Sequence, residues 1–403
     1  MNETLIRKAF VYLDTLCNVT GNRSVGSAGN LKSTEFFENS VLPFGWEIEK
    51  DELAAMDWTP GSASLTAKGK SFTVSASPYS NGCNCEGDLL PVSCYDELKQ
   101  ADLQGRVLLL YGDIAREQLM PKNFVFYNPQ NHRRIISLLE EKKPEAIICA
   151  TGRNSELAGG SYPFPLIEDG DFDIPSVYMT DKEGERLIRF SGEKVSVHSS
   201  AFRIPSKAWN ITAVKGSQDL KRIVITGHID AKRGTPGAID NATGVVILLL
   251  IAELLSGYCG GYRVELVPLN GEDYYAVPGQ MCYIKKNEGR FGDIVLNINI
   301  DGAGYFEGDT AFSFYGVSER TQSIVKDILK AGSGVSAGPE WPQGDHSIFI
   351  QYGVPAMAVT SMWFTDNMHN QDVTHTEKDR PEIVDIAKTV QAAEIISKIV
   401  EKL

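Results

Sequence analysis

The feature that most constrains the fold of this chain is a regular alternation of short apolar runs and helical segments after Pro205. The strand-like runs cover 221–226, 263–269, 293–300, 310–316 and 354–360, and helical patterns begin at 244, near 279, at 321 and at 385. Strands that alternate with helices indicate a largely parallel sheet covered by helices on both faces. We therefore predict an α/β fold with a mostly parallel central sheet.

The first 200 residues have a different texture. Residues 1–18 fit an amphipathic helix, and a second helix is expected to start near Leu31. Between residues 58 and 200, short β-branched or alternating runs lie between Gly, Pro and Asn clusters, with one helical stretch at 133–143. We predict a first part of the main domain at 1–61, a β-rich inserted domain at 62–205, and the remainder of the main domain at 206–403.

The composition narrows the classes of partner. Its 39 basic and 52 acidic residues give a net charge of -13, which disfavours binding to nucleic acid or anionic lipid. The longest apolar run, 244–255, is far shorter than the roughly 20 residues that span a bilayer, so we expect no membrane segment. The N-terminus lacks the pattern of a signal peptide, which predicts a cytoplasmic protein, or a secreted one if a leader was removed. Seven cysteines at irregular spacings predict mostly reduced thiols rather than a disulfide framework.

Three successive predicted strands are each followed directly by a histidine or by carboxylates. These residues are His228 and Asp230, then Glu272 and Asp273, then Asp301, with Asp240 on the loop that enters the next helix. In an open α/β sheet the active site lies beyond the carboxyl ends of the strands, so these side chains are expected to meet at one edge.

A cage of two histidines, one of them His228, and three of these carboxylates can hold a pair of zinc ions, because imidazole nitrogen and carboxylate oxygen are usual zinc ligands at catalytic sites. Three carboxylates against two Zn²⁺ leave a single positive charge, which a bridging hydroxide would cancel. Without metal the same carboxylates would repel one another. The charges therefore favour two zinc ions per chain.

Five segments together resemble the successive motifs of family 28 of the metallopeptidases. They are GHIDAKRGTPGAIDNATG (227–244), LNGEDYYAVPGQ (269–280), NIDGAG (299–304), GDHSIFIQYGVPA (344–356) and THTEKDRPEIVD (374–385). That family includes aminopeptidase Y, the bacterial leucine aminopeptidases and glutamate carboxypeptidase. In the insertion, segments 102–113, 144–152 and 174–187 resemble a protease-associated domain, and GNRSVGSAGN (21–30) is similar to the segment that opens the peptidase domain.

The resemblance implies a role for each residue of the site. One zinc would be held by His228 and Asp301, the other by Asp273 and His375, and both by the bridging ligand Asp240. Glu272 would be the general base, and the carboxylate of Asp230 would orient the imidazole of His228. The peptide bond from Asp240 to Asn241 is expected to be cis.

Two positions depart from the family pattern. Asp273 stands where most relatives have Glu, and its shorter arm predicts weaker binding of the second zinc. Thr374 stands where relatives often have a Tyr that supports the oxyanion, so the oxyanion donor is not identified. His369 lies six residues before His375, but the spacing HTxxDxxxxVD fits 375–385 and selects His375 as the ligand.

Several residues near these motifs keep two interpretations. Asp345 and His346 match a family motif, yet they suit packing of the loop as well as contact with substrate. Four aromatic residues could line a specificity pocket or belong to the core: Tyr274, Tyr275, Trp341 and Trp363.

The expected function is hydrolysis of N-terminal peptide bonds by a two-zinc aminopeptidase that acts on peptide substrates. A homodimer is allowed for. Another amide hydrolase, such as a deacylase or a carboxypeptidase-like enzyme, could use the same cage of ligands. A receptor or scaffold that lost the chemistry is the alternative outside enzymes, and the intact ligands and Glu272 argue against it.

Overall fold

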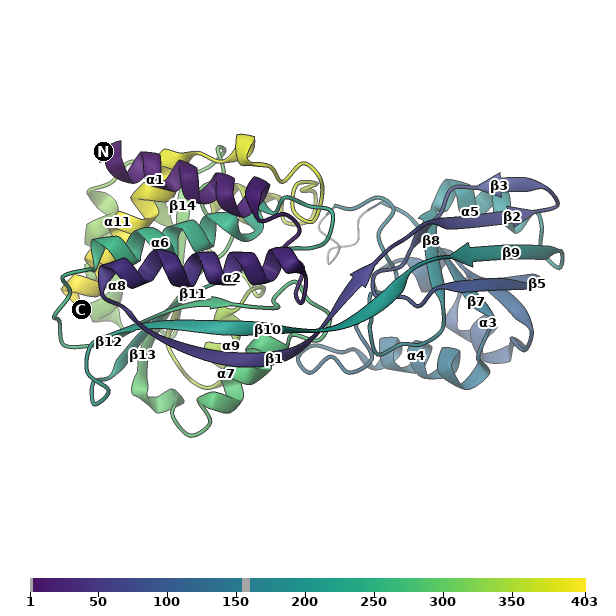
Figure 1. The fold of residues 1–403 in the computed structure, drawn as a ribbon, viewed down its shortest axis with the longest axis horizontal. Helices are drawn as coiled ribbons and strands as arrows, with labels where there is room; N and C mark the ends of the chain where they lie inside the picture. Colours follow the sequence, from purple (N-terminus) through teal and green to yellow (C-terminus); the bar gives the residue numbers. More distant parts are fainter. Residues whose placement is uncertain (1–2, 154–159) are drawn as a thin grey trace. The chain divides into compact units, whose positions relative to one another are not determined.

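The computed structural model describes residues 3–153 and 160–403, which fold into two compact units (Figure 1). The α/β unit comprises Met1–Ala55 and Lys207–Leu403, and the inserted unit comprises Met56–Ser206. Both boundaries fall inside long strands that run from one unit into the other, β1 (Glu47–Thr59) and β10 (Phe202–Lys215). No continuous apolar run in the sequence predicted these two strands as single elements.

The α/β unit contains an eight-stranded sheet in the order β1-β10-β12-β11-β13-β16-β14-β15. Its other strands are β11 (Arg222–His228), β12 (Arg263–Leu269), β13 (Ile294–Ile300), β14 (Thr310–Tyr315), β15 (Val335–Ala337) and β16 (Ala356–Ser361). The four central strands β12, β11, β13 and β16 are parallel, whereas β10 and β14 join antiparallel. The centre of the sheet is parallel, as the alternation of strands and helices predicted.

Helices cover both faces of this sheet, which confirms the predicted class. On one face lie α1 (Glu3–Asp14), α2 (Ala28–Val41), α6 (Thr243–Leu254) and α11 (Ile386–Lys402), above the strands in Figure 1, and α7 (Pro278–Lys286) lies below them. Every residue of α6 from Thr243 to Ala252 is buried, because α6 packs between β11 and β12 on one side and α1, α2 and α11 on the other. The remaining helices of this unit are α8 (Glu319–Lys330), α9 (His346–Gln351) and α10 (Met362–Asn367).

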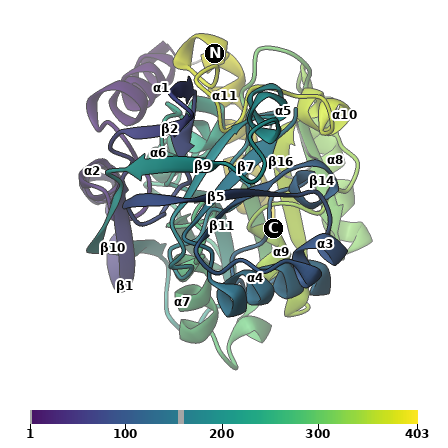
Figure 2. The same cartoon turned by 90° about the vertical axis from the view of Figure 1, so that its right-hand side faces the viewer.

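The inserted unit has its own eight-stranded sheet, in the order β3-β2-β9-β5-β6-β7-β8-β4. The strands are β2 (Ala63–Ala67), β3 (Lys70–Phe72), β4 (Ser75–Ala76), β5 (Cys83–Val92), β6 (Arg106–Leu110), β7 (Ala146–Thr151), β8 (Ser176–Thr180) and β9 (Lys194–Ser199). Figure 2 shows α5 (Asp181–Ile188) above this sheet, and α3 (Tyr95–Gln100) and α4 (Gln130–Lys142) below it. Only α4 was predicted, because α3 and α5 are too short to show a helical period.

Two further expectations concern the whole chain. Among residues 3–153 and 160–403, no helix has the length and apolar character needed to cross a membrane. All seven cysteines carry free thiols, as their number and spacing predicted.

Candidate metal centre

Three parallel strands deliver the site residues to one edge of the sheet. His228 is the last residue of β11, and it pairs in register with Leu269 at the end of β12. Glu272 and Asp273 therefore emerge just beyond β12, at the level of His228. On the other side of β11, Thr226 pairs with Asn299, so that Asp301 follows the end of β13 at the same edge.

The other two residues come from irregular segments. Asp240 lies in a short turn, η4 (Ala238–Ala242), directly before α6, and the backbone angles of Asp240 and Asn241 in this turn are not helical. The peptide bond from Asp240 to Asn241 is cis, as predicted. The Asn241 side chain anchors this turn, because its Nδ2 donates to Ile300 O at 2.7 Å and its Oδ1 accepts from Gly244 N at 3.0 Å.

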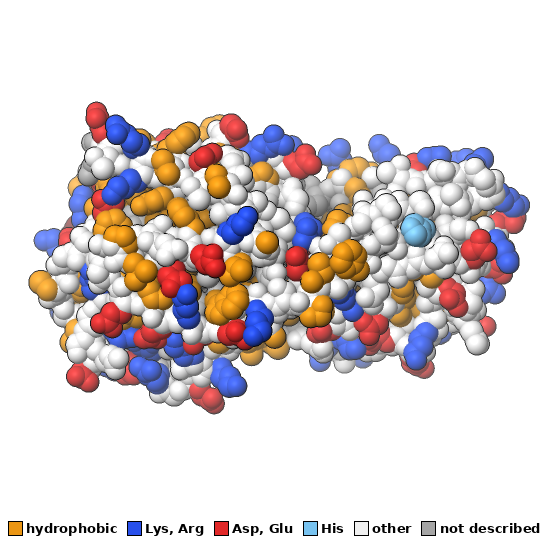
Figure 3. Space-filling model, in the orientation of Figure 1, with side chains coloured by type: hydrophobic (Ala, Val, Ile, Leu, Met, Phe, Trp, Pro, Cys, Tyr) orange, Lys and Arg blue, Asp and Glu red, His pale blue; other side chains and the backbone are white. Residues whose placement is uncertain are grey.

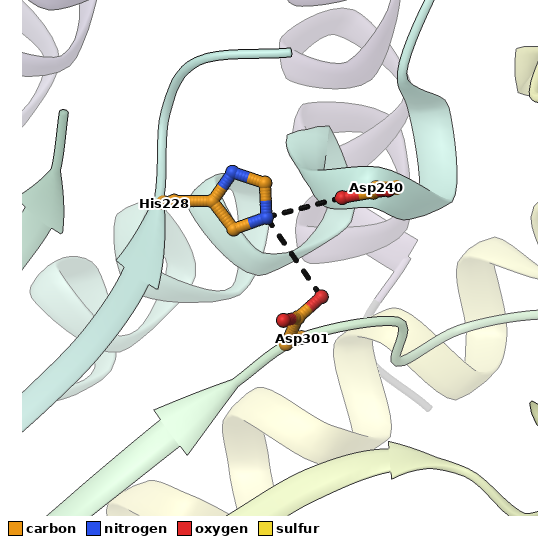
Figure 4. A group of neighbouring side chains, drawn as sticks. All are labelled: His228, Asp240 and Asp301. Atoms are coloured by element: carbon orange, nitrogen blue, oxygen red, sulfur yellow. Dashed lines mark ion pairs between the residues drawn. The ribbon is translucent and has the colours of Figure 1, made fainter. Parts of the chain in front are cut away.

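Two groups of three side chains lie close enough to hold a metal ion each, and they share Asp240. One group is His228, Asp240 and Asp301, and the other is Asp240, Asp273 and His375. His228 Nε2 lies 3.1 Å from Asp240 Oδ1 and 3.8 Å from Asp301 Oδ1 (Figure 4). These are the five residues named as ligands from the sequence, and the loop that follows α10 contributes His375 to them.

Asp240 presents its two oxygens to two different histidines. Oδ1 faces His228, while Oδ2 lies 3.1 Å from His375 Nε2. His375 Nε2 is also 3.0 Å from Asp273 Oδ1. A carboxylate with one oxygen directed to each half of the cluster has the geometry that a bridging ligand requires.

Two buried polar atoms support occupation by metal. Among the described residues, Asp273 Oδ2 is buried without a hydrogen-bond partner, and the buried His228 Nε2 forms no hydrogen bond of normal geometry although Asp240 Oδ1 lies 3.1 Å away. Burial alone would lower the pKa of His228 and of His375, but the surrounding carboxylates more than offset it and raise each pKa well above the usual value. The cluster thus attracts positive charge, and zinc would replace the protons that the imidazoles otherwise hold. The residues fit a pair of zinc ions.

Glu272 and Asp301 are close to several other carboxylates of the cluster. Burial is the main cause that raises the pKa of Glu272 well above its usual value, and the charges of Asp273, Asp301 and Asp345 add to it. Burial likewise raises the pKa of Asp301, although His228 opposes the shift. A carboxyl group with a raised pKa can hold a proton near neutral pH, as a general base that later acts as an acid must do.

Asp230 holds the loop that carries Glu272 and Asp273. Its Oδ1 accepts from Gly271 N at 2.7 Å and from Glu272 N at 3.3 Å, and its Oδ2 accepts from Asp273 N at 3.1 Å. His228 Nδ1 lies 3.2 Å from the main-chain oxygen of Asp230 but 3.7 Å from its carboxylate. The carbonyl is the nearer partner of the imidazole, so the carboxylate contacts His228 less closely than the resemblance implied.

The segment that carries this site matches a known protein family. Residues 210–400, which include all seven of these residues, match the model of peptidase family M28. This segment is an M28 peptidase domain. It covers most of the α/β unit described above, but not α1, α2 or β1.

Two relatives align with most of the length of this chain. Leucine aminopeptidase 2 of Trichophyton equinum is 22% identical over 367 residues, which cover 83% of this chain and 68% of the relative. Aminopeptidase YwaD of Bacillus subtilis is 19% identical and covers 97% of this chain and 83% of the relative.

Solved structures show the same fold. The aminopeptidase from Aneurinibacillus sp. strain AM-1 superposes with a TM-score of 0.74 at 20% identity, covering 98% of this chain and 93% of that one. BSAP, a zinc aminopeptidase from Bacillus subtilis, also gives a TM-score of 0.74, at 18% identity, with 98% and 94% covered.

Most of the other candidate residues near this site are buried. Asp345 and His346 are buried, and Asp345 Oδ1 accepts from Gln280 Nε2 at 3.1 Å. Of the four aromatic candidates for a specificity pocket, Tyr274, Tyr275 and Trp341 are buried, which favours their interpretation as core. Trp363 is half-buried and packs against Tyr305 and Phe364.

Sequence reasoning missed two charged residues that contact the loop bearing Asp240. Arg23 and Asp379 are 2% and 0% exposed. Burial and the charge of Asp240 raise the pKa of Asp379 to about 7. The available signals were that Arg23 is the one charged residue of segment 21–30 and that Asp379 is the first Asp of the spacing HTxxDxxxxVD.

Proposed function

We propose that this protein is a two-zinc aminopeptidase, an enzyme that removes the N-terminal residue of peptides. The observation that carries the proposal is the shared carboxylate: Asp240 directs one oxygen to His228 and the other to His375. Membership of the M28 family and relatives named as aminopeptidases support it.

The proposed zinc ligands divide as the two side-chain groups do. His228 and Asp301 would hold one ion, Asp273 and His375 the other, and Asp240 both. Zinc, when bound, supplies Lewis-acid chemistry: it acidifies a water molecule and polarises the scissile carbonyl group.

The protein's own residues would then move and direct the proton. Glu272 accepts the proton of the attacking water and returns it to the nitrogen of the leaving amine. The Asp230 carboxylate fixes the backbone at Gly271, Glu272 and Asp273 through three N–H groups, so the base and a ligand keep a constant spacing.

Charge favours a free amine over a carboxylate as the group that anchors the substrate. The neighbours that most affect the pKa of Glu272 are Asp273, Asp301, Asp345 and the proposed ligand His228, and none of these is Lys or Arg. These neighbours offer acidic partners for a cationic N-terminus and no Lys or Arg to pair with the C-terminal carboxylate that a carboxypeptidase binds. This supports aminopeptidase over carboxypeptidase-like activity.

The remaining expectations stay proposals. The similarity of the inserted unit to a protease-associated domain, the cytoplasmic location and a homodimer rest on the sequence alone. On the face of the α/β unit seen in Figure 3, acidic and basic side chains are intermingled, which supports the expectation that nucleic acid is not a partner.

A panel of short peptides tests the function. Zinc-restored protein should release the first residue from peptides with a free N-terminus and should lose this activity when the same peptides are N-acetylated. Faster cleavage of the acetyl group would indicate a deacylase, and release of the last residue a carboxypeptidase-like enzyme. Two bound zinc ions without hydrolysis of any peptide would favour a receptor or scaffold.

A further inference from the structure

The loop between β11 and α6 carries the proposed bridging ligand, yet strand pairing does not hold it. It runs from residue 229 to residue 242. Two buried side chains of opposite charge, Arg23 and Asp379, contact its backbone from segments far away in the sequence.

Arg23 binds the carbonyl groups of this loop. Its Nε donates to Ile229 O at 3.1 Å, its Nη1 to Pro236 O at 2.8 Å, and its Nη2 to Gly237 O at 2.7 Å. Nη1 also donates to Leu16 O at 2.9 Å, in the N-terminal helical segment. One guanidinium group therefore fixes both ends of the segment 229–237.

Asp379 binds the N–H groups that follow. Its Oδ1 accepts from Ile239 N at 2.7 Å and its Oδ2 from Asp240 N at 3.0 Å, while its main-chain oxygen accepts from Ala238 N at 3.3 Å. The two oxygens of one carboxylate thus hold two successive N–H groups of the turn. Asp379 is also only four residues beyond His375, so it links the two loops that meet at the second group of ligands.

We propose that Arg23 and Asp379 are positioning residues that fix the backbone of Asp240 and thereby set the affinity of both metal ions at once. The inference rests on the proposed two-zinc function, in which Asp240 is the ligand shared by both ions. Neither residue belongs to either group of ligands. A displaced bridge weakens two sites, whereas a displaced terminal ligand weakens mainly one. Paired loss of metal is therefore the signature that separates this role from ligation and from general stabilisation of the fold.

Asp379→Asn is the direct test. The amide keeps one acceptor oxygen and turns an NH₂ group toward a backbone N–H that needs an acceptor. Loss of such a supporting contact typically weakens metal binding by about 10 to 100-fold. Titration of the metal-free protein with zinc against a chromophoric chelator should show both ions weakened together by such a factor. Asp327→Asn, at an exposed position on α8, is the matched control and should bind zinc as the wild type does.

Further variants make the result decisive. Asp301→Asn should weaken chiefly one ion, and Asp379→Glu, which restores two acceptor oxygens, should recover part of the paired affinity. Urea denaturation of the metal-free proteins identifies any variant that does not fold. If Asp379→Asn does not fold, Arg23→Lys takes its place, since one ammonium group cannot reach all four carbonyls.

The outcomes are distinguishable. A folded Asp379→Asn protein with unchanged affinities, or with only one ion weakened, overturns the positioning role, and the same results in Arg23→Lys do so if that variant must be used. Wild-type protein that never binds two zinc ions would instead remove the proposed function.

Discussion

Replacing Glu272 by Gln separates catalysis from metal binding and from folding. The contact that fixes this residue is made by its backbone N–H, which donates to Asp230 Oδ1 at 3.3 Å, and the neighbouring Asp273 N donates to Asp230 Oδ2 at 3.1 Å. Both contacts survive the substitution. Glu272 is in neither group of candidate ligands, so zinc content should not change.

The magnitude follows from what the amide cannot do. Gln is similar in size to Glu and can hydrogen-bond a water, but it cannot accept the proton. Loss of a positioned general base typically lowers the rate by about 10² to 10⁴, or roughly 3 to 5 kcal/mol of activation free energy. The expected signature is a collapse in kcat, a small change in KM and two zinc ions still bound.

The raised pKa of Glu272 predicts the direction in which Glu272→Gln changes the stability of the metal-free protein. Burial raises the pKa of Glu272 in the folded state, so the ionised carboxylate lowers the free energy of unfolding above its unfolded pKa of about 4.3. This loss grows as the pH rises toward the folded pKa. Neutral Gln lacks it, and metal-free Glu272→Gln should be at least as stable as the wild type at pH 7.

Steady-state kinetics on a dipeptide substrate, zinc analysis and urea denaturation together check these expectations. Glu288→Gln, at an exposed position after α7, is the matched control and should leave all three unchanged. Loss of zinc from Glu272→Gln would make Glu272 a ligand and reverse the assignment of the Glu272 and Asp273 pair. Full activity would place the base elsewhere and refute the mechanism.

Three further predictions address metal, pH and packing. Mild chelation should empty the site of Asp273 and His375 first, because the Asp273 side chain is short and the His375 side chain is 26% exposed, whereas that of His228 is 1% exposed. Zinc content and activity measured together after each step of chelation check this. Burial lowers the pKa of His346 to about 4, so on acidification the unfolded chain binds a proton first, and the free energy of unfolding falls as the pH drops from about 6.5 through 4. Over that range the free energy of unfolding of metal-free His346→Gln, measured by urea denaturation, should fall by up to about 3 kcal/mol less than that of the wild type. Phe349→Ala should lower the free energy of unfolding by about 3 to 5 kcal/mol, since this side chain is fully buried against Tyr283 and Phe291; a urea midpoint that does not move would show that the site repacks.

The sequence predicted the centre of the α/β unit because its elements are long and periodic. Each central strand is a continuous apolar run, and its carboxyl end meets those of its parallel neighbours at one edge of the sheet. Residues placed just beyond such strands must gather, which is why His228, Asp273 and Asp301 could be expected together before any coordinates. The outer strands β1 and β10 lack such runs, since they are partly exposed and carry many polar residues.

The contacts of Arg23 and Asp379 could not be predicted from the sequence. They bond to backbone atoms, and any residue type presents the same carbonyl and N–H groups, so no sequence pattern reveals the partner. The same reason explains Asp230, whose carboxylate binds three backbone N–H groups rather than forming the close contact with His228 that the family pattern implied. Side-chain pairs leave a signal in spacing, whereas backbone contacts depend on the folded path of the chain.

The central claim is that two metal ions share the carboxylate of Asp240, and zinc-edge anomalous diffraction from zinc-loaded crystals tests it most directly. We predict two anomalous peaks for each chain, one beside His228 and Asp301 and one beside Asp273 and His375, with an oxygen of Asp240 bound to each. A single peak at saturating zinc, or two peaks that Asp240 does not join, would contradict the account.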